Sequence, residues 1–143
     1  MAERKYWLDL FAGKTWEKFL QNGAKVSGFR ERKRKMTQKI HPGDYFLCYL
    51  TGISRFIGVL EVKSECYVDN TLIWEEAAFQ YRFKVELIYQ LTPKSAIPIH
   101  NLGEKLSLFK NLASKKAWTG FFRGCPVEFS QEDGIIIWVI KKK

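Results

Sequence analysis

Apolar side chains along this chain fall into short runs, and most of the runs carry the spacing of β-strands. Residues 79–87 alternate apolar and polar side chains, which predicts a strand with one buried and one wet face, extended by 88–91. Residues 45–50 and 56–62 are almost continuously apolar, as is typical of strands buried on both faces. The turn residues 51–54 separate these two runs and predict a hairpin.

Helical spacing is confined to short segments. Three apolar residues share one helix face after the capping residue Thr15, and Asn22–Gly23 ends that helix; they are Trp16, Phe19 and Leu20. Residues 102–109 predict a second short helix. Ser130 followed by Glu132 and Asp133 resembles a helix N-terminus, although Gly134 and the three isoleucines after it favour a strand. We predict a helix there.

The remaining local signals complete a mainly β-fold. Residues 6–11 are an aromatic-rich strand candidate, 27–39 a basic connection, and 41–44 a type II turn with Pro and Gly at the favoured positions. Gly58, inside a strand, predicts a bulge or a close backbone approach. With no linker or repeat, we expect one domain over 1–143. Its predicted fold is a mixed but mainly β, antiparallel pseudo-barrel with short peripheral helices.

Charge is concentrated in one segment. The chain has 143 residues, 24 Lys and Arg against 15 Asp and Glu, and an aromatic content of 15%. Residues 30–39 alone hold six cations and one anion, and 141–143 are three lysines. A focal basic segment on an aromatic-rich domain points to nucleic acid as the partner, with phosphate contacts from Arg30, Arg32, Lys33, Arg34 and Lys35. The alternative is a solvated loop that keeps the protein soluble.

Several function classes lack support in the sequence. No apolar run is long enough for a membrane span, and the N-terminus does not resemble a signal peptide. The three cysteines form no CxxC pair, so a reducing, cytoplasmic setting is expected. His41 and His100 have no metal-binding spacing, and no nucleophile or phosphate-loop motif is present. We therefore expect no cofactor, no metal and no membrane partner, and we take a monomer as the expected state.

The segment 118–124 has the residue types that a nucleobase pocket needs. An extruded base needs flat aromatic surfaces for stacking and a few polar groups for its edge. The aromatic candidates are Trp118, Phe121 and Phe122, with Thr119 as a hydrogen-bonding group and Arg123 as a phosphate contact. The alternative interpretation is a plug of core aromatics that seals one end of the barrel.

Further pocket candidates come from other parts of the chain. Gly28 and Phe29 open the basic segment, where Phe29 is either a pocket wall or an anchor for the loop. Trp7 and Tyr49 are either pocket residues or core. Asp69 is either a ligand-facing acceptor or, like Asp44, a turn residue.

Taken in order, the motifs of this chain resemble those of one known family. They run over nearly the whole length: Tyr6-Trp7, Gly28 before the basic segment, Ile40-His41-Pro42-Gly43-Asp44, Phe56-Ile57-Gly58-Val59 with Glu61-Val62, Tyr67-x-Asp69 and Trp118-Thr119-Gly120-Phe121-Phe122-Arg123-Gly124. On these motifs the chain is identified as a member of the EVE domain family, PUA-like pseudo-barrels related to YTH domains. Two residues depart from the pattern. Many relatives have Trp at the position of Ser27, and some have His at the position of Phe121.

The resemblance implies a function. Domains of this family resemble readers of modified nucleobases, which bind a flipped base such as a methylated cytosine in an aromatic-lined cleft of DNA or RNA, without catalysis. The implied pocket residues are Trp7, Ser27, Gly28, Phe29, Tyr49, Asp69, Trp118, Thr119, Phe121 and Phe122. A reader of this size is expected to act with an effector protein.

Two other classes of function stay open. One is an RNA-processing or RNA-modification accessory protein that binds RNA through the basic loop, with Asp44, Asp69 and Glu75-Glu76 as its only acidic candidates. The other is a small-molecule or protein interaction module whose charge is incidental. Salt-dependent binding of nucleic acid separates the reader from the interaction module, and turnover of a nucleotide substrate separates the reader from an enzyme.

Overall fold

The computed structural model describes residues 4–71, 73, 79–92, 94–98 and 125–140. The elements in these residues, in chain order, are β1 (Tyr6–Phe11), α1 (Gly13–Gln21), β2 (Val26–Phe29), η1 (Glu31–Lys33), α2 (Arg34–Thr37), β3 (Tyr45–Leu50), β4 (Arg55–Val62), β5 (Tyr67–Val68), β6 (Tyr81–Gln90), β7 (Ile97–Pro98), β8 (Glu128–Phe129) and α5 (Gln131–Ile140). The predicted helix at 102–109 and the lysine tail lie outside the described residues.

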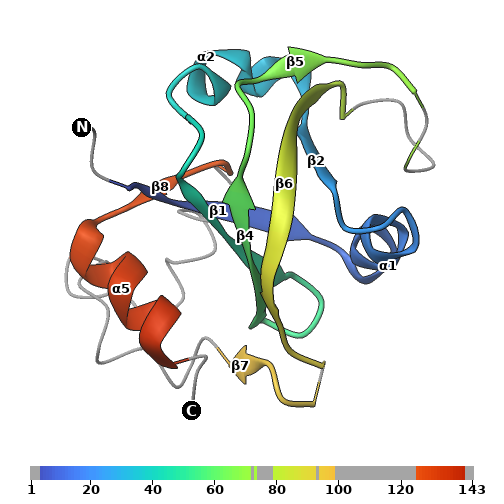
Figure 1. Ribbon diagram of the computed structural model, residues 1–143. Coiled ribbons are helices and arrows are strands. Elements are labelled where there is room, and N and C mark those ends of the chain that lie inside the picture. Colours follow the sequence, from blue (N-terminus) through green and yellow to red (C-terminus); the bar gives the residue numbers. More distant parts are fainter. Residues whose placement is uncertain (1–3, 72, 74–78, 93, 99–124, 141–143) are drawn as a thin grey trace.

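The strands form one curled sheet, which confirms the mixed, mainly β pseudo-barrel (Figure 1). Its main order is β2-β6-β4-β3-β1-β8, with β5 beside β6 and β7 beside β4. The predicted hairpin is present as the antiparallel pair β3 and β4. The prediction of an antiparallel sheet was wrong at one place: β1 and β3 pair in parallel. Two parallel neighbours need a long crossover, and α1, β2, η1 and α2 supply it.

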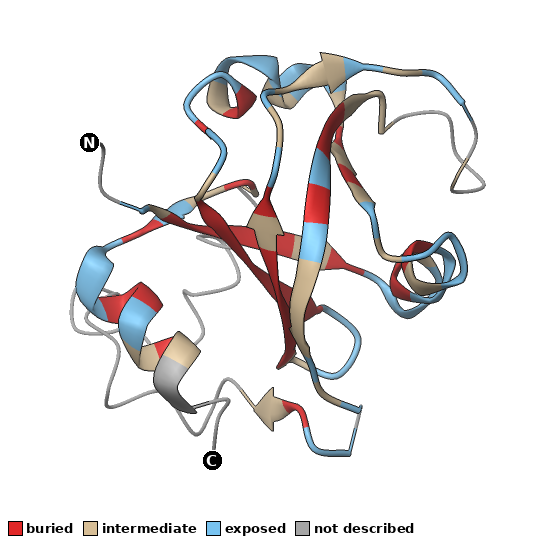
Figure 2. Ribbon diagram, in the orientation of Figure 1, coloured by how far each residue is buried: buried red, intermediate tan, exposed pale blue. Residues whose placement is uncertain are grey.

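Two apolar clusters pack on the two faces of this sheet. One contains Trp16 and Phe19 of α1, and the other contains Ile137 of α5. All six residues of β3 are buried, as is most of β4, so these central strands are covered on both sides as predicted (Figure 2). Hydrophobic burial on two faces is the main stabilising contribution in a fold of this size.

Local sequence signals account for several of the turns and close contacts. Gly43 has φ +96° and Asp44 N–H donates to the His41 carbonyl at 3.1 Å, as the type II turn requires. A Cβ atom on Gly58 would lie 3.1 Å from both the Trp16 ring and the Tyr89 carbonyl oxygen, and the sheet register shifts beside it. The predicted close approach at Gly58 is therefore confirmed.

The C-terminal segment is helical, as predicted. The Ser130 hydroxyl accepts a hydrogen bond from Asp133 N–H at 3.1 Å, which caps the helix. The segment 27–39 is more structured than the expected connection, because it contains the last residues of β2 and two short helices. Within the described residues, no helix is both long and apolar enough to cross a membrane.

Candidate functional site

A cleft of about 130 Å³ opens where β1, β2, η1 and the start of the β6 segment meet. Its lining combines cations, aromatic rings, backbone and one carboxyl group: Asp9, Leu10, Gly28, Phe29, Arg30, Arg32, Lys33, Phe79 and Cys125. These residues come from four separate stretches of the chain, which the sheet brings together because β2 pairs with β6. Five of the nine, Gly28, Phe29, Arg30, Arg32 and Lys33, belong to the set that the sequence predicts for the pocket and its phosphate contacts.

The entrance of the cleft is cationic and aromatic. The guanidinium carbon of Arg30 lies 4.8 Å from the centre of the Phe79 ring, within the range of a cation–π contact. Arg32 is exposed and Lys33 is half-buried on η1. Three positive side chains at the mouth of one recess attract phosphate groups, which strengthens binding most at low ionic strength.

Gly28 allows β2 to pass close to the segment at Phe79. A Cβ atom at this position would lie 2.7 Å from the Phe79 carbonyl oxygen and 3.3 Å from Arg82 Cγ. Any side chain there would push the Phe79 segment away from β2. The glycine therefore sets the width of the cleft between these two elements.

Phe29 serves mainly as an anchor. It is 5% exposed, and its ring packs 5.5 Å from Phe46 and 6.1 Å from Phe83, measured between ring centres. Phe29 is also among the residues that line the cleft. Of the two alternatives for Phe29, the structure therefore gives more weight to the loop anchor.

A buried carboxyl group, that of Asp9, belongs to the lining of the cleft. Asp9 is 2% exposed, and Ser27, which is also buried, donates a hydrogen bond from its hydroxyl to Asp9 Oδ2 at 2.5 Å. Burial raises the pKa of Asp9 to about 7, and the Ser27 hydrogen bond opposes this shift. Asp9 therefore changes its protonation state near neutral pH.

Two thiols lie close to this carboxyl group. Cys125 Sγ donates to the Leu8 carbonyl at 3.3 Å and accepts from Leu10 N–H at 3.3 Å, so it fixes the chain beside β1. Burial raises the pKa of Cys125 and of Cys48 well above the usual range of a thiol, and the nearby Asp9 adds to both shifts. Both thiols stay protonated and unreactive at neutral pH.

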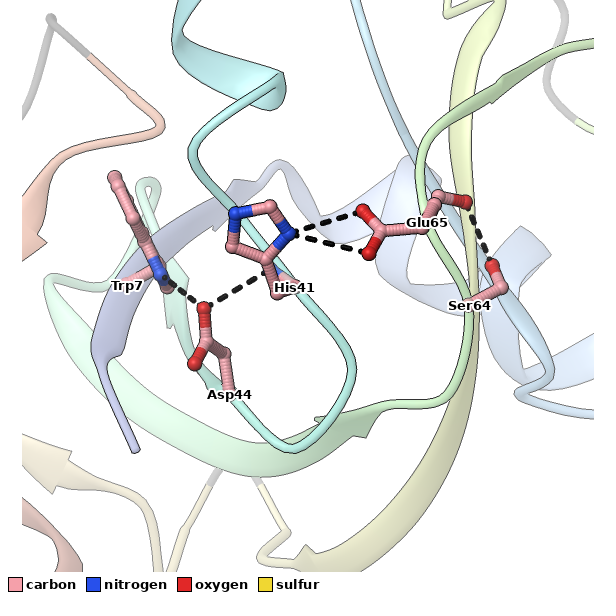
Figure 3. A network of polar contacts seen from close by, with 5 residues as sticks. All are labelled: Trp7, His41, Asp44, Ser64 and Glu65. Carbon is pink, nitrogen blue, oxygen red and sulfur yellow. Dashed lines mark hydrogen bonds and ion pairs between the residues drawn. The ribbon is translucent and has the colours of Figure 1, made fainter. Parts of the chain in front are cut away.

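Two predicted pocket residues lie in the core. Trp7 is fully buried, and its indole N–H donates to Asp44 Oδ2 at 3.0 Å (Figure 3). The same carboxylate accepts hydrogen bonds from the backbone N–H groups of Lys5 and His41, which confirms Asp44 as a turn residue. Tyr49 packs edge-on against Phe56 at 5.1 Å. Neither Trp7 nor Tyr49 lines the cleft.

Asp69 lies at a different structural site. It pairs with the buried Arg82, whose Nη1 is 3.6 Å from Asp69 Oδ1, and it accepts a hydrogen bond from Thr71 N–H at 2.8 Å. The Thr71 hydrogen bonds lower the pKa of Asp69, with a smaller contribution from Arg82. The structure favours the turn interpretation of Asp69.

The remaining predicted residues are placed as follows. Arg34 and Lys35 are exposed on α2, next to the cleft in sequence but not among its lining residues. Trp118, Thr119, Phe121, Phe122 and Arg123 lie outside the described residues. Ser27 is not among the lining residues of the cleft, and its hydroxyl donates a hydrogen bond to Asp9.

The sequence analysis missed Asp9, Leu10, Phe79 and Cys125 as cleft residues. Asp9 carries a usable signal, because a carboxyl group inside an apolar strand must be neutralised or paired when the strand is buried. Phe79 and Cys125 carry no comparable signal, since their positions depend on pairing across the sheet. Among the described residues, no cluster of His, Cys, Asp and Glu is arranged to hold a metal ion.

A curled, mainly antiparallel sheet with short peripheral helices and a basic cleft at one edge defines a PUA-like pseudo-barrel. The EVE domain family model matches residues 5–124, and the chain belongs to this family. Comparison with curated protein sequences gave no significant match.

Solved structures share the fold at low sequence identity. The Pho92 YTH domain, crystallised in complex with m6A, has a TM-score of 0.72 and 18% identity, over 100% of this chain and 87% of that one. The YTH domain of the Zygosaccharomyces rouxii MRB1 protein, in complex with N6-methyladenosine RNA, has a TM-score of 0.69 and 17% identity, over 100% and 90%. Protein Atu2648 from Agrobacterium tumefaciens has a TM-score of 0.65 and 13% identity, over 96% and 92%.

Proposed function

We propose that this EVE domain is a non-catalytic module that binds nucleic acid and accepts one modified base in the cleft between β1, β2 and η1. The backbone of the strand lies across the cationic entrance, and one base is turned out of its stack into the recess. The modified base is a methylated one, with methylated cytosine and N6-methyladenine as the two candidates to compare.

The composition of the cleft carries this proposal. The lining contains three cations, Arg30, Arg32 and Lys33, together with two aromatic residues, Phe79 and Phe29, and the buried carboxyl group of Asp9. Phosphate attraction, aromatic contact and a polar group for the base edge are the three requirements of an extruded-base site. The cleft brings all three together in one recess.

The relatives in fold support the same ligand class. Two of the YTH domains that share this fold were crystallised with m6A or N6-methyladenosine RNA. A related fold with a cleft of this composition favours a methylated nucleobase over an unrelated small molecule. At 18% and 17% identity, the choice of base is decided by the side chains of this chain.

Fluorescence anisotropy with matched oligonucleotides tests the proposal. The set contains single-stranded DNA and RNA with one central cytosine, 5-methylcytosine, adenine or N6-methyladenine, each measured at two salt concentrations. We expect one modified oligonucleotide to bind more tightly than its unmodified partner, with a preference that persists at the higher salt. Equal affinity for modified and unmodified strands at both salt concentrations would contradict a base-reading cleft.

A charge variant tests the entrance separately. Arg32→Ala combined with Lys33→Ala should weaken binding to all strands, and the slope of log affinity against log salt should fall by about 1.4 for single strands if both cations contact phosphates. The matched control is Lys14→Ala with Lys18→Ala, which removes the same charge from the exposed side of α1. If both double variants change the slope equally, the cleft entrance is not the phosphate site.

A further inference from the structure

The carboxyl group of Asp9 is buried, yet it belongs to the lining of the cleft. It is 2% exposed and lies on β1, in the same cleft lining as Arg30, Arg32 and Lys33. Among the described residues, the hydroxyl of Ser27 donates the one hydrogen bond that Asp9 receives, and it goes to Oδ2. No described residue forms a hydrogen bond with the other oxygen, Oδ1, and Asp9 is among the residues that line the cleft.

Among the described residues, no counter-ion is in direct contact with Asp9. The hydroxyl of Ser27 on β2 donates a hydrogen bond to Asp9, and two thiols lie nearby, those of Cys48 on β3 and of Cys125 in the segment before β8. The thiol of Cys125 is already engaged with Leu8 and Leu10. The positive charges at the entrance do not form an ion pair with Asp9 in the described residues. A buried carboxyl group without an ion pair is most stable as the neutral acid.

We propose that Asp9 is the specificity-determining residue of the cleft: as a neutral acid, it reads a base edge that presents one acceptor beside one donor, such as the ring nitrogen and amino group of cytosine or adenine. This inference rests on the proposed function of the cleft. It selects against the two-donor edge of guanine, which pairs with an ionised carboxylate.

The hydrogen bonds follow from the position of Ser27. Because the Ser27 hydroxyl donates to Oδ2, that atom is the carbonyl oxygen of the acid and the proton sits on Oδ1. The Oδ1–H group then donates to the ring nitrogen of the base, and the amino group of the base donates to the second lone pair of Oδ2. Ser27 is a positioning residue, since it fixes which oxygen carries the proton.

The test is the pH dependence of binding between pH 6 and pH 9, measured with the tighter-binding modified oligonucleotide and with a strand that carries one guanine at the same position. Because the pKa of Asp9 is about 7, we expect the affinity for the modified strand to fall by up to about tenfold per pH unit above pH 7. The affinity for the guanine strand should not fall in this way.

Three variants separate the role of Asp9 from general electrostatics. Asp9→Asn keeps a donor beside an acceptor without a titrating proton, so it should retain selective binding and lose the pH dependence. Asp9→Ala should bind the modified strand and the guanine strand alike. Ser27→Ala removes a hydrogen bond that lowers the pKa of Asp9, so the midpoint of the pH dependence should move upward. A merely structural Ser27 would not shift that midpoint.

The possible results distinguish this inference from the proposed function. If the wild-type protein shows no preference for any modified strand at any pH, the proposed function fails. If a modified strand is preferred, but its affinity is independent of pH and Asp9→Ala still binds it more tightly than the guanine strand, the proposed function stands and the role of Asp9 is wrong. Loss of binding in Asp9→Asn, with wild-type affinity that rises with pH, would show an ionised carboxylate and also overturn the inference.

Discussion

At the scale of single residues, Gly134 shows how one missing side chain fixes the position of a helix. A Cβ atom there would lie 2.3 Å from Tyr6 Cγ, well inside contact distance. Gly134→Ala gains about 1 kcal/mol of helix propensity, but the clash between α5 and β1 should cost more, so we expect net destabilisation of about 1–3 kcal/mol. Urea unfolding measures the difference.

Gly13 is the matched control for that substitution. It begins α1, and a Cβ atom built on it has no heavy-atom neighbour within 4 Å. Gly13→Ala should therefore leave stability unchanged or raise it by up to about 1 kcal/mol, through a less flexible unfolded chain. Equal effects of the two alanines would mean that α5 does not pack on Tyr6 this closely.

Asp9 also makes stability depend on pH. The pKa of its carboxyl group is about 7 in the folded protein against 3.8 as the ordinary value. Between these values the folded state holds a proton that the unfolded state has lost, so stability falls as the pH rises through this window. From pH 4 to pH 8, we expect wild type to lose on the order of 4 kcal/mol relative to Asp9→Asn. Parallel urea-unfolding stabilities of the two proteins across this range would contradict the shift.

These residues mark the limit of what the sequence predicts. The alternation in residues 6–11 predicts a strand, but not that Asp9 meets Ser27, which lies 18 positions away. Gly134 has a low helix propensity, so the sequence gives no reason for a glycine in this helix. The reason is the close approach of Tyr6, which leaves no room for a Cβ atom. Turn and strand signals depend on neighbours in the chain, whereas cleft and packing residues depend on partners from other strands.

At the scale of elements, Arg82 anchors the segment between β5 and β6. Its side chain is 2% exposed; Nε donates to the Phe79 carbonyl at 2.9 Å and Nη2 donates to the Thr71 carbonyl. Arg82→Met would leave these carbonyls without their donors, at about 1–3 kcal/mol for each one that stays buried. We expect faster hydrogen exchange at Asp69 N–H and in β5, with β3 and β4 unchanged.

Lys84 provides the control for Arg82 on the same strand. Its side chain is exposed, two positions further along β6. Lys84→Met should therefore leave exchange in β5 at the wild-type rate. Because Phe79 lines the cleft, Arg82→Met should also weaken oligonucleotide binding, and a normal affinity with fast exchange would separate the anchor from the cleft.

The order of the elements was only partly predictable. The hairpin of β3 and β4 follows from two apolar runs and a short turn, all local features. The parallel pairing of β1 with β3 does not, because nothing in residues 6–11 specifies which strand lies beside them. That pairing nevertheless decides the site, since it brings Asp9 beside Cys48 in the middle of the sheet.

At the scale of the whole molecule, the two apolar clusters share the strands β1, β3 and β4. Trp7 and Trp16 belong to one cluster, and Trp138 packs against the other. Because the same central strands contribute to both clusters, disruption of one cluster would also expose the other cluster to water. We therefore predict a single cooperative unfolding transition, with the midpoints and slopes of tryptophan fluorescence and far-ultraviolet circular dichroism coinciding in urea.

A variant that keeps only Trp138 makes this test sharper, because its fluorescence reports on the α5 face alone. Trp138 lies 5.0 Å from the Tyr45 ring of β3, between ring centres, so it senses the sheet through that contact. If α5 and the sheet unfold together, its transition coincides with that of a matched variant that keeps only Trp16 on the opposite face. A lower urea midpoint for the Trp138 variant alone would mean that α5 detaches before the sheet unfolds. The sheet and α1 would then form the cooperative unit, and α5 would unfold independently of it.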